Sequence, residues 1–312
     1  MKLRIGTRGS RLALAQSEYI KKRIMQEHPD IRIELVKIKT KGDRILNSPL
    51  SMIGGKGLFV KEIEEALLNK DVDLAVHSIK DVPAELPEGL FMPIFPKRED
   101  PRDALLSMEY NSLDELPENG NIGTGSLRRS AQLLSQRPDL NVVSLRGNVD
   151  TRIKKLETDH LQGIILAVAG LNRLGLSSRI KQILEPKDFL PAVGQGAIGV
   201  ELRVGDDITI DLLNFLNDKS TESGVRAERS FLKELGGGCQ VPIAGYCLPR
   251  GDKDEGLILE GMVAGLDGRT IMRDREAGTK DNPEDIGVRL ARRLLDSGAK
   301  KILSGIYGEE KR

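Results

Sequence analysis

Residues 3–24, LRIGTRGSRLALAQSEYIKKRI, pass from a short apolar strand through a glycine–serine turn into a helix. Ser10 stands where a helix N-cap is expected, because inward-facing positions follow it at helical spacing: Ala13, Ser17, Ile20 and Ile24. A strand that turns directly into a helix presents backbone N–H groups and the positive end of the helix dipole. The stretch therefore predicts an α/β unit whose turn suits an anion.

The alternation of strand and helix continues along the chain. A second strand is expected over residues 31–40, and a short buried strand over residues 73–77. Between them lies a predicted helix with Val60, Ile63 and Leu67 on its inner face. This order predicts a mostly parallel sheet with helices on both faces.

A pattern like the opening one begins again at residue 122. There IGTGS precedes Ala131-Gln132, much as IGTRGS precedes Ala15-Gln16. The second helix is expected to turn Leu127, Ala131 and Leu134 inward. Because the two offsets differ by one residue, both chance and a pair of similar α/β domains explain the echo.

The composition is that of an ordinary globular protein. With 39% hydrophobic and 30% charged residues, a chain of 312 residues can form two or three domains with cores of their own. The 48 basic and 47 acidic residues nearly cancel, which gives no support for a nucleic-acid or anionic-membrane partner. The sequence shows no pattern of a secretory signal or membrane span, so we expect a cytoplasmic protein.

Arginines gather beside the predicted turns, mostly just after a strand, where open α/β sheets bind ligands. They are Arg8, Arg11, Arg128, Arg129, Arg146, Arg152 and Arg173. Each one alone is equally well explained as a surface residue. The adjacent Arg128 and Arg129, however, would repel each other at a helix start unless an anion joins them. The set predicts a ligand with several negative groups.

The segment HSIKDVP, residues 77–83, places Lys80 and Asp81 side by side at the end of a buried strand. An ordinary turn explains this pair. The functional interpretation is a carboxylate that nearby cations keep ionised, so that it stabilises positive charge and exchanges protons. His77 is expected to make a structural hydrogen bond. The three histidines lack a metal-ligand spacing, which disfavours metal catalysis.

Two further segments carry unusual glycines. Residues 42–58 form a long connection that predicts a lid or a disordered loop, and we favour a lid in which Lys56 reaches over an anionic ligand. GGGCQVP, residues 236–242, places Cys239 after three glycines, and Cys247 is the only other cysteine. The spacing lacks a CxxC motif, and a disulfide is disfavoured in a reducing compartment. Filler, metal ligand, nucleophile and attachment point all remain open for Cys239.

As a set, the motifs closely resemble those of the porphobilinogen deaminases, also called hydroxymethylbilane synthases. The resemblance rests on segments that occur in the family's order over nearly the whole chain: TRGSRLALAQ, GGKGLFVKE, HSIKDVP, REDPRDA, GTGSLRRSAQ, SLRGNVDTR, LAVAGLNRLG, LPAVGQGAIGVE and GGGCQVP. It implies a transferase of tetrapyrrole biosynthesis. Such an enzyme condenses four porphobilinogen molecules head to tail into hydroxymethylbilane and releases ammonia at each step.

The resemblance also implies a dipyrromethane cofactor, held by a thioether to Cys239, which makes this cysteine a tether. Asp81 matches the catalytic aspartate, with Lys80 beside it, and is implied to help the amino group leave and to stabilise cationic azafulvene and pyrrole intermediates. Positions that match cofactor ligands are Arg8, Ser10, Asp43, Ser78, Lys80, Asp81, Thr124, Ser126, Arg128, Arg129, Arg146 and Arg152. Positions that match substrate ligands are Arg8, Gln16, Lys56, Arg146, Arg152 and Arg173. Met52 stands where some relatives carry a lysine, which puts one lid contact in doubt.

The expected fold class is α/β: two domains like those of type II periplasmic binding proteins around a cleft, plus a smaller C-terminal α+β domain. We expect residues 1–99 with 200–217 in the first domain, 100–199 in the second and 218–312 in the third. The family also implies a monomer. An anion-binding solute-binding or sensor protein of the same fold is the main alternative, and it would need neither Asp81 nor Cys239. A thiol-dependent redox or metal protein is disfavoured because Cys239 and Cys247 lack a ligand spacing.

Overall fold

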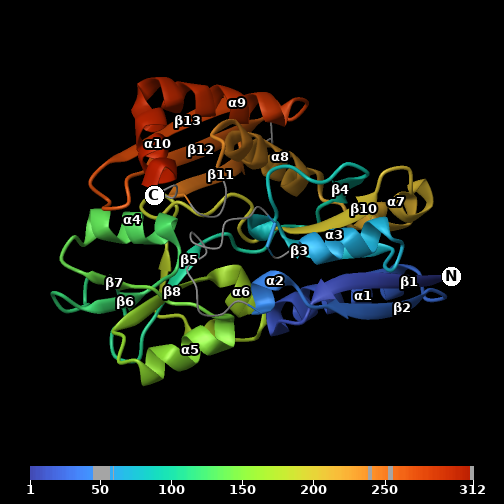
Figure 1. Ribbon diagram of the computed structural model, residues 1–312, viewed down its shortest axis with the longest axis horizontal. Coiled ribbons are helices and arrows are strands. Elements are labelled where there is room, and N and C mark those ends of the chain that lie inside the picture. The colour runs from blue at the N-terminus through green and yellow to red at the C-terminus, as the bar shows by residue number, and fades with distance from the viewer. Residues whose placement is uncertain (45–56, 59, 238–240, 252–255, 310–312) are drawn as a thin grey trace.

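The structure is a computed structural model, which describes residues 1–44, 57–58, 60–237, 241–251 and 256–309. Within these ranges the strands form three sheets (Figure 1). The first sheet is ordered β2 (Arg32–Ile38), β1 (Lys2–Arg8), β3 (Leu74–Ser78), β10 (Ile198–Arg203) and β4 (Leu90–Ile94). The second is ordered β7 (Asn141–Val143), β6 (Asn121–Gly123), β8 (Gly163–Ala167), β5 (Asp103–Leu106) and β9 (Gln182–Leu184).

The first two sheets share one topology. In each, the first three strands pair in parallel, and an antiparallel strand, β10 or β5, lies between the third strand and the sheet edge. The chain leaves the first sheet after β4 and returns to it as β10, so two segments cross between the sheets. The predicted mostly parallel sheets are confirmed, and so is the expected fold class of two similar α/β units with a smaller α+β unit.

The sequence echo corresponds to equivalent positions of the two sheets. Helix α1 (Arg11–Glu27) follows β1 and begins at Ser10, whose hydroxyl accepts a hydrogen bond from the Ala13 N–H at 3.3 Å. Helix α4 (Leu127–Gln136) follows β6 and begins at Ser126, whose hydroxyl accepts from the Arg129 N–H at 3.4 Å. Both serines satisfy backbone donors that a helix start leaves unpaired.

Helices cover both faces of each of these sheets. On the first sheet, α1 and α7 (Asp207–Leu213) pack on one face, and α3 (Lys61–Leu68) packs on the other. The second sheet is covered by α4 on one face, and by α5 (Val149–Thr158) and α6 (Val168–Arg173) on the other. The short helix α2 (Lys41–Arg44) follows β2.

One expectation for α4 is wrong. Leu127 and Leu134 are only partly buried, and Leu133 joins the core instead, although Ala131 is buried as expected. The face is rotated because Arg128 and Arg129, which amphipathic patterning places outside, are both 4% exposed. A buried anion draws them inward, as described below.

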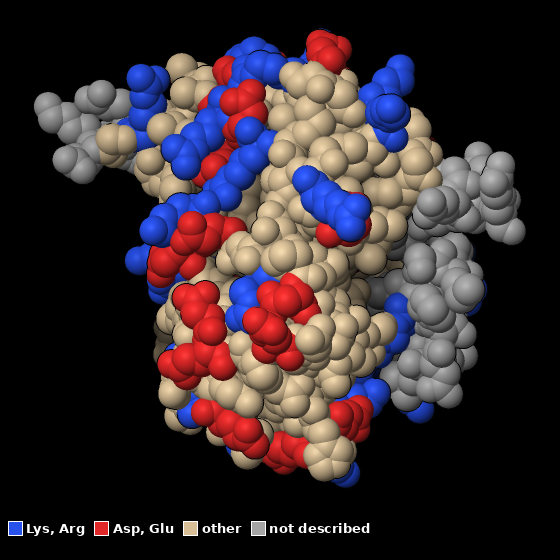
Figure 2. All heavy atoms as spheres, turned by 90° about the vertical axis from the view of Figure 1, so that its left-hand side faces the viewer, with Lys and Arg blue, Asp and Glu red and all other residues tan. Residues whose placement is uncertain are grey.

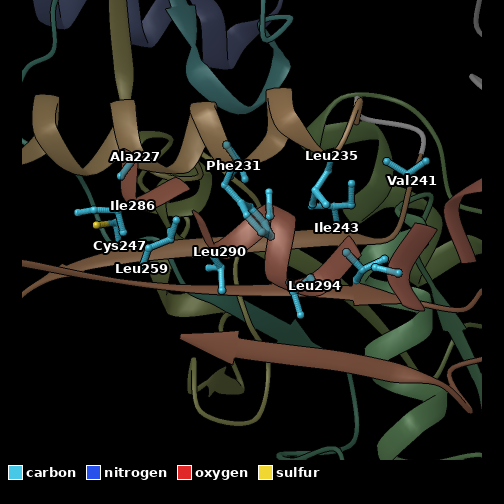
Figure 3. Close-up of a cluster of buried hydrophobic side chains, with 14 of the residues drawn as sticks. Ala227, Phe231, Leu235, Val241, Ile243, Cys247, Leu259, Ile286, Leu290 and Leu294 are labelled. Atoms are coloured by element: carbon cyan, nitrogen blue, oxygen red, sulfur yellow. The ribbon is translucent and has the colours of Figure 1, made fainter. Parts of the chain in front are cut away.

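The third sheet is antiparallel and carries β11 (Ile243–Pro249), β12 (Leu257–Ala264) and β13 (Ile271–Gly278). Two helices pack together on it, α8 (Lys219–Glu234) and α9 (Pro283–Leu294), and a kink at Gly298 leads into α10 (Lys300–Glu309). Figure 3 shows the resulting core, in which side chains of α8 and α9 meet those of β11 and β12. Helix α9 begins after Asn282, with Pro283 at its first position, where the missing backbone N–H of proline costs no helical hydrogen bond.

The surface agrees with the balanced charge of the sequence. Figure 2 shows Lys and Arg side chains lying next to Asp and Glu side chains across one face. No helix in the described ranges has both the length and the apolar character needed to cross a bilayer.

Candidate functional site

Two adjoining pockets share Leu12, Gln16 and Ser78 in their walls, and one of them is lined by residues of both of the first two α/β units. The first, here called the cationic pocket, is lined by residues of both halves of the chain, among them Lys80, Arg129, Arg152 and Arg173. The second, here called the Asp81 pocket, is lined by residues of the first half, among them Arg8, Ser10, His77 and Asp81. Much of both walls comes from segments that follow strands β1, β3 and β8, as expected for ligand sites of open α/β sheets.

A short turn aims Lys80 and Asp81 at the pockets. It is a single 3-10 turn, Ile79–Asp81, directly after β3, and it is closed by the Val82 N–H donating to the Ile79 carbonyl at 3.1 Å. Gly194 packs against this turn with a φ of +70°, and a Cβ there would lie 2.2 Å from Cγ2 of Ile79. Glycine is therefore required at position 194 both for backbone conformation and for space.

Gln16 connects the wall built by α1 to the wall built by β3. Its amide nitrogen lies 2.7 Å from the Ser78 hydroxyl, and the side chain is buried. Because Gln16 and Ser78 line both pockets, this hydrogen bond stands at their shared boundary.

The cations of the cationic pocket are held in an unfavourable electrostatic environment. Burial, assisted by Arg129, lowers the pKa of Lys80 to about 8, although Asp81 opposes the shift. Burial and Arg129 also lower the pKa of Arg152 to about 10, again against Asp81. Burial lowers the pKa of Arg173, against the opposing charge of Glu99. The negative charges of a bound polyanion would oppose these shifts, so the pocket suits an anion with several negative groups.

Arg128 and Arg129 already have an anion, which the sequence interpretation missed. The fully buried Asp103 carboxylate lies 2.8 Å from Nη1 of Arg128 and 2.6 Å from Nη2 of Arg129. Arg128 also donates to the Leu190 carbonyl, and it lines neither pocket. The prediction that an anion must join the two arginines is confirmed, but the joining anion is a residue of the chain. An aspartate at the start of the apolar strand DALL was the available signal, because a buried carboxylate requires cationic partners.

Backbone contacts fix two other arginines of the pocket. Arg152 donates from Nε to the Gly147 carbonyl at 2.8 Å, and Arg173 donates from Nη2 to the Gly196 carbonyl at 2.7 Å. These contacts leave both side chains in the pocket wall.

The remaining residues predicted for the site line neither pocket or lie outside the described residues. Ser126 caps α4, buried Thr124 accepts from the Ser126 N–H at 3.2 Å, and Arg146 lies in neither wall. Lys56, Cys239, Met52 and most of the proposed lid lie outside the described residues, and so does the side chain of Asp43.

His77 makes the structural hydrogen bond that its sequence context predicts. Its Nε2 lies 2.8 Å from Oε2 of Glu201, and both side chains are buried. Among the residues that the structure describes, no group of three or more His, Cys, Asp or Glu side chains is placed to hold a metal ion.

Comparison with known proteins identifies the family. Residues 3–211 match the family described as "Porphobilinogen deaminase, dipyromethane cofactor binding domain", and residues 223–296 match its C-terminal domain. The porphobilinogen deaminase of Trichlorobacter lovleyi is 52% identical over 99% of this chain and 98% of its own length. The porphobilinogen deaminase of Nitratidesulfovibrio vulgaris is 54% identical over 97% of this chain and 96% of its own length. The chain belongs to the porphobilinogen deaminase family.

Porphobilinogen deaminases are transferases that release ammonia as they build hydroxymethylbilane from four porphobilinogen molecules, and the first matched domain binds dipyrromethane. The pocket fits such a group, because four cationic side chains line one cavity, and burial lowers the pKa of three of them. Among solved structures, the methionine-binding protein MetQ matches 68% of this chain and 88% of its own, with a TM-score of 0.45 and 14% identity. This likeness carries no information about what the chain binds.

Proposed function

We infer that the cationic pocket binds carboxylates of dipyrromethane and porphobilinogen, and that Asp81 carries out the chemistry beside it. The observation that supports this most is the convergence of Lys80, Arg129, Arg152 and Arg173 on one pocket, with Asp81 in the adjoining one. Pyrroles of this pathway carry an acetate and a propionate, so each added ring brings two negative charges. Arginine forks suit such carboxylates because they donate two parallel hydrogen bonds.

When it is bound, dipyrromethane supplies the pyrrole to which the first substrate molecule is joined. Asp81 would stabilise the positive charge that develops on porphobilinogen as its amino group leaves as ammonia. Its carboxylate oxygens are also suited to accept the proton that the pyrrole ring loses after the new bond forms. Gln16 and Ser78, at the boundary of the two pockets, would orient the ring between the cations and Asp81.

Cys239 is proposed as the attachment point of the cofactor. Helix α8 ends at Glu234, and Gly236, with a φ of +65°, turns the chain away from the helix axis before the cysteine. Such a left-handed glycine is a common helix end. The three glycines that precede Cys239 in the sequence have no Cβ atoms, so a bulky group could extend from the thiol without a clash with their side chains.

The other residues that match family ligands complete the proposal: Arg8, Ser10, Asp43, Lys56, Thr124, Ser126, Arg128 and Arg146. The domain boundaries at 1–99 with 200–217, 100–199 and 218–312 are likewise proposed, as are a monomeric state and a cytoplasmic location. Sedimentation velocity and cell fractionation test the last two.

Intact-mass spectrometry combined with two substitutions tests the function. The purified chain should carry an excess equal to two pyrrole units, which Cys239→Ser should abolish. Asp81→Asn should keep that excess and yet lose nearly all turnover, because the amide cannot stabilise the cation as a carboxylate does. Normal turnover in Asp81→Asn would refute the assignment of Asp81. An excess that persists in Cys239→Ser would refute the assigned tether.

A further inference from the structure

We propose that Arg229 of helix α8 is a positioning residue that holds the Asp81 turn from outside the pockets. The proposal rests on the catalytic role given to Asp81 above. Arg229 lines neither pocket, so it does not act by touching a ligand there. Its contacts run instead to the backbone immediately after the turn.

The guanidinium of Arg229 binds three consecutive carbonyl groups. Nη2 donates to Pro83 O at 2.7 Å and to Ala84 O at 3.1 Å, and Nη1 lies 3.4 Å from Val82 O. The same Val82 closes the 3-10 turn through its N–H. The carbonyls that Arg229 contacts therefore begin at Val82, the residue that follows Asp81 in the chain. One residue beyond the carbonyls, Glu85 pairs with Lys233 of the same helix at 3.1 Å.

These contacts fix a loop that has little regular structure of its own. Residues 82–89 separate the turn from β4 and belong to no helix or strand. A guanidinium presents its donors in a rigid planar fork, and charge-assisted hydrogen bonds are stronger than neutral ones. Burial lowers the pKa of Arg229, while Glu201 opposes that shift. An arginine stays charged at neutral pH despite such a shift, so the loop is held by a permanent cation.

The position of Arg229 on its helix gives the contact a second consequence. Ala227 and Phe231 point from α8 into the core of the third sheet (Figure 3). Residue 229 is about 200° around the helix from residue 227, so it projects from the opposite side, toward the first sheet. The same helix leads through Gly236 and Gly237 toward Cys239. Helix α8 therefore sets the catalytic turn in relation to the origin of the proposed tether. Arg229 makes the contact nearest to the turn, and the Lys233–Glu85 pair lies farther along the loop.

The test compares Arg229→Met with Arg226→Met in the cofactor-loaded enzyme. Arg226 is the matched control, because it lies one turn earlier on α8 and pairs with Glu284, away from the Asp81 loop. Arg229→Met should lower kcat by about 10- to 100-fold, since a misplacement of the order of 1 Å costs that much. It should leave KM within about threefold of the value for the unsubstituted enzyme and keep the two-pyrrole mass excess, because the cationic pocket is unchanged. Values of kcat within twofold of the Arg226→Met control would overturn the proposal.

A double-mutant cycle that combines Arg229→Met with Asp81→Glu tests whether Arg229 positions Asp81 or has only a general structural role. If Arg229 acts only through Asp81, Arg229→Met should lower kcat by less than about threefold in the Asp81→Glu background. An undiminished loss in that background would overturn the proposal. If Arg229→Met does not fold, Arg229→Lys decides: one ammonium cannot reproduce the fork, so kcat should fall at unchanged KM, and an unchanged kcat would overturn the proposal. The failure of this inference is distinct from failure of the function, because full activity in Asp81→Asn would refute the role of Asp81 whatever Arg229 does.

Discussion

The Arg129 guanidinium lies 2.6 Å from the Asp103 carboxylate, whose other oxygen lies 2.8 Å from Arg128. Gln195 donates to the same group at 3.0 Å, so a fully buried carboxylate has three side-chain partners. Burial alone would raise the pKa of Asp103, but the two arginines outweigh it and hold that pKa far below its usual range. The group that orients Arg129 in the cationic pocket is thus ionised at every pH at which the protein is expected to work.

Removal of the Asp103 charge should strongly destabilise the fold. Asp103→Asn leaves two buried guanidinium groups without their anion, which costs about 3–5 kcal/mol in the free energy of unfolding. Urea denaturation checks the value. Asp139→Asn is the control, because it removes an aspartate that pairs with Arg137 at the surface. Equal denaturation midpoints for the two variants would contradict the role of Asp103 as a buried counter-ion.

Lys80 should make ligand capture depend on pH. With a pKa of about 8, it is protonated below that pH and neutral above it. The cofactor-free chain should therefore gain mass from porphobilinogen more slowly as the pH rises from 7 to 9, beyond the change seen in Lys80→Met. The free energy of unfolding should instead rise with pH. The cost of burying the Lys80 charge is fully present below pH 8, and it is relieved as the pH rises from 8 toward 10.5, the ordinary pKa of lysine. A mass gain with the same pH profile in both proteins would rule out this role for Lys80.

Two glycines with the same φ test whether close packing against the Asp81 turn matters for stability and activity. Gly194 and Gly175 both have a φ of +70°, but a Cβ at 194 would meet Ile79 at 2.2 Å, while nothing lies within 4 Å of one at 175. Gly175→Ala should cost about 1 kcal/mol for the backbone conformation alone. Gly194→Ala should cost more and also lower kcat, because Ile79 precedes Lys80 and Asp81 in the turn. Similar losses of stability and activity in both variants would show that the turn tolerates displacement.

The ion pair of Arg11 and Asp150 joins the two halves of the chain beside the cationic pocket. Their charged atoms lie 2.7 Å apart, and the neighbouring Leu12 and Val149 both line that pocket. Arg11→Asp and Asp150→Arg should each raise KM for porphobilinogen, by about fivefold at most, because exposed pairs contribute about 0–1 kcal/mol. The exchanged double variant should recover most of the loss. A double variant that is no better than the worse single variant would exclude pairing between these residues.

Local features of the sequence predicted much of this structure. Ser10 was identifiable as a cap, because the helical spacing that reveals it follows directly in the sequence. Features that depend on distant contacts were not. The rotation of α4 follows from Asp103, 25 residues away from Arg128, and the loop carbonyls reached by Arg229 lie about 146 residues from it. No periodicity encodes such pairs, and only the general cost of a lone buried charge points toward one of them.

The shared topology of the first two sheets has a consequence for the place where synthesis occurs. Strands β3 and β8 occupy equivalent places, yet β3 is followed by Ile79, Lys80 and Asp81, whereas β8 is followed by Val168, Ala169 and Gly170. The duplicated framework thus carries an acid on one side and small or apolar residues on the other. If Asp81 is the reactive group, each incoming ring must be joined on the β3 side, and the finished rings must be stored elsewhere. The asymmetry would confine the joining step to one side of a nearly symmetric scaffold.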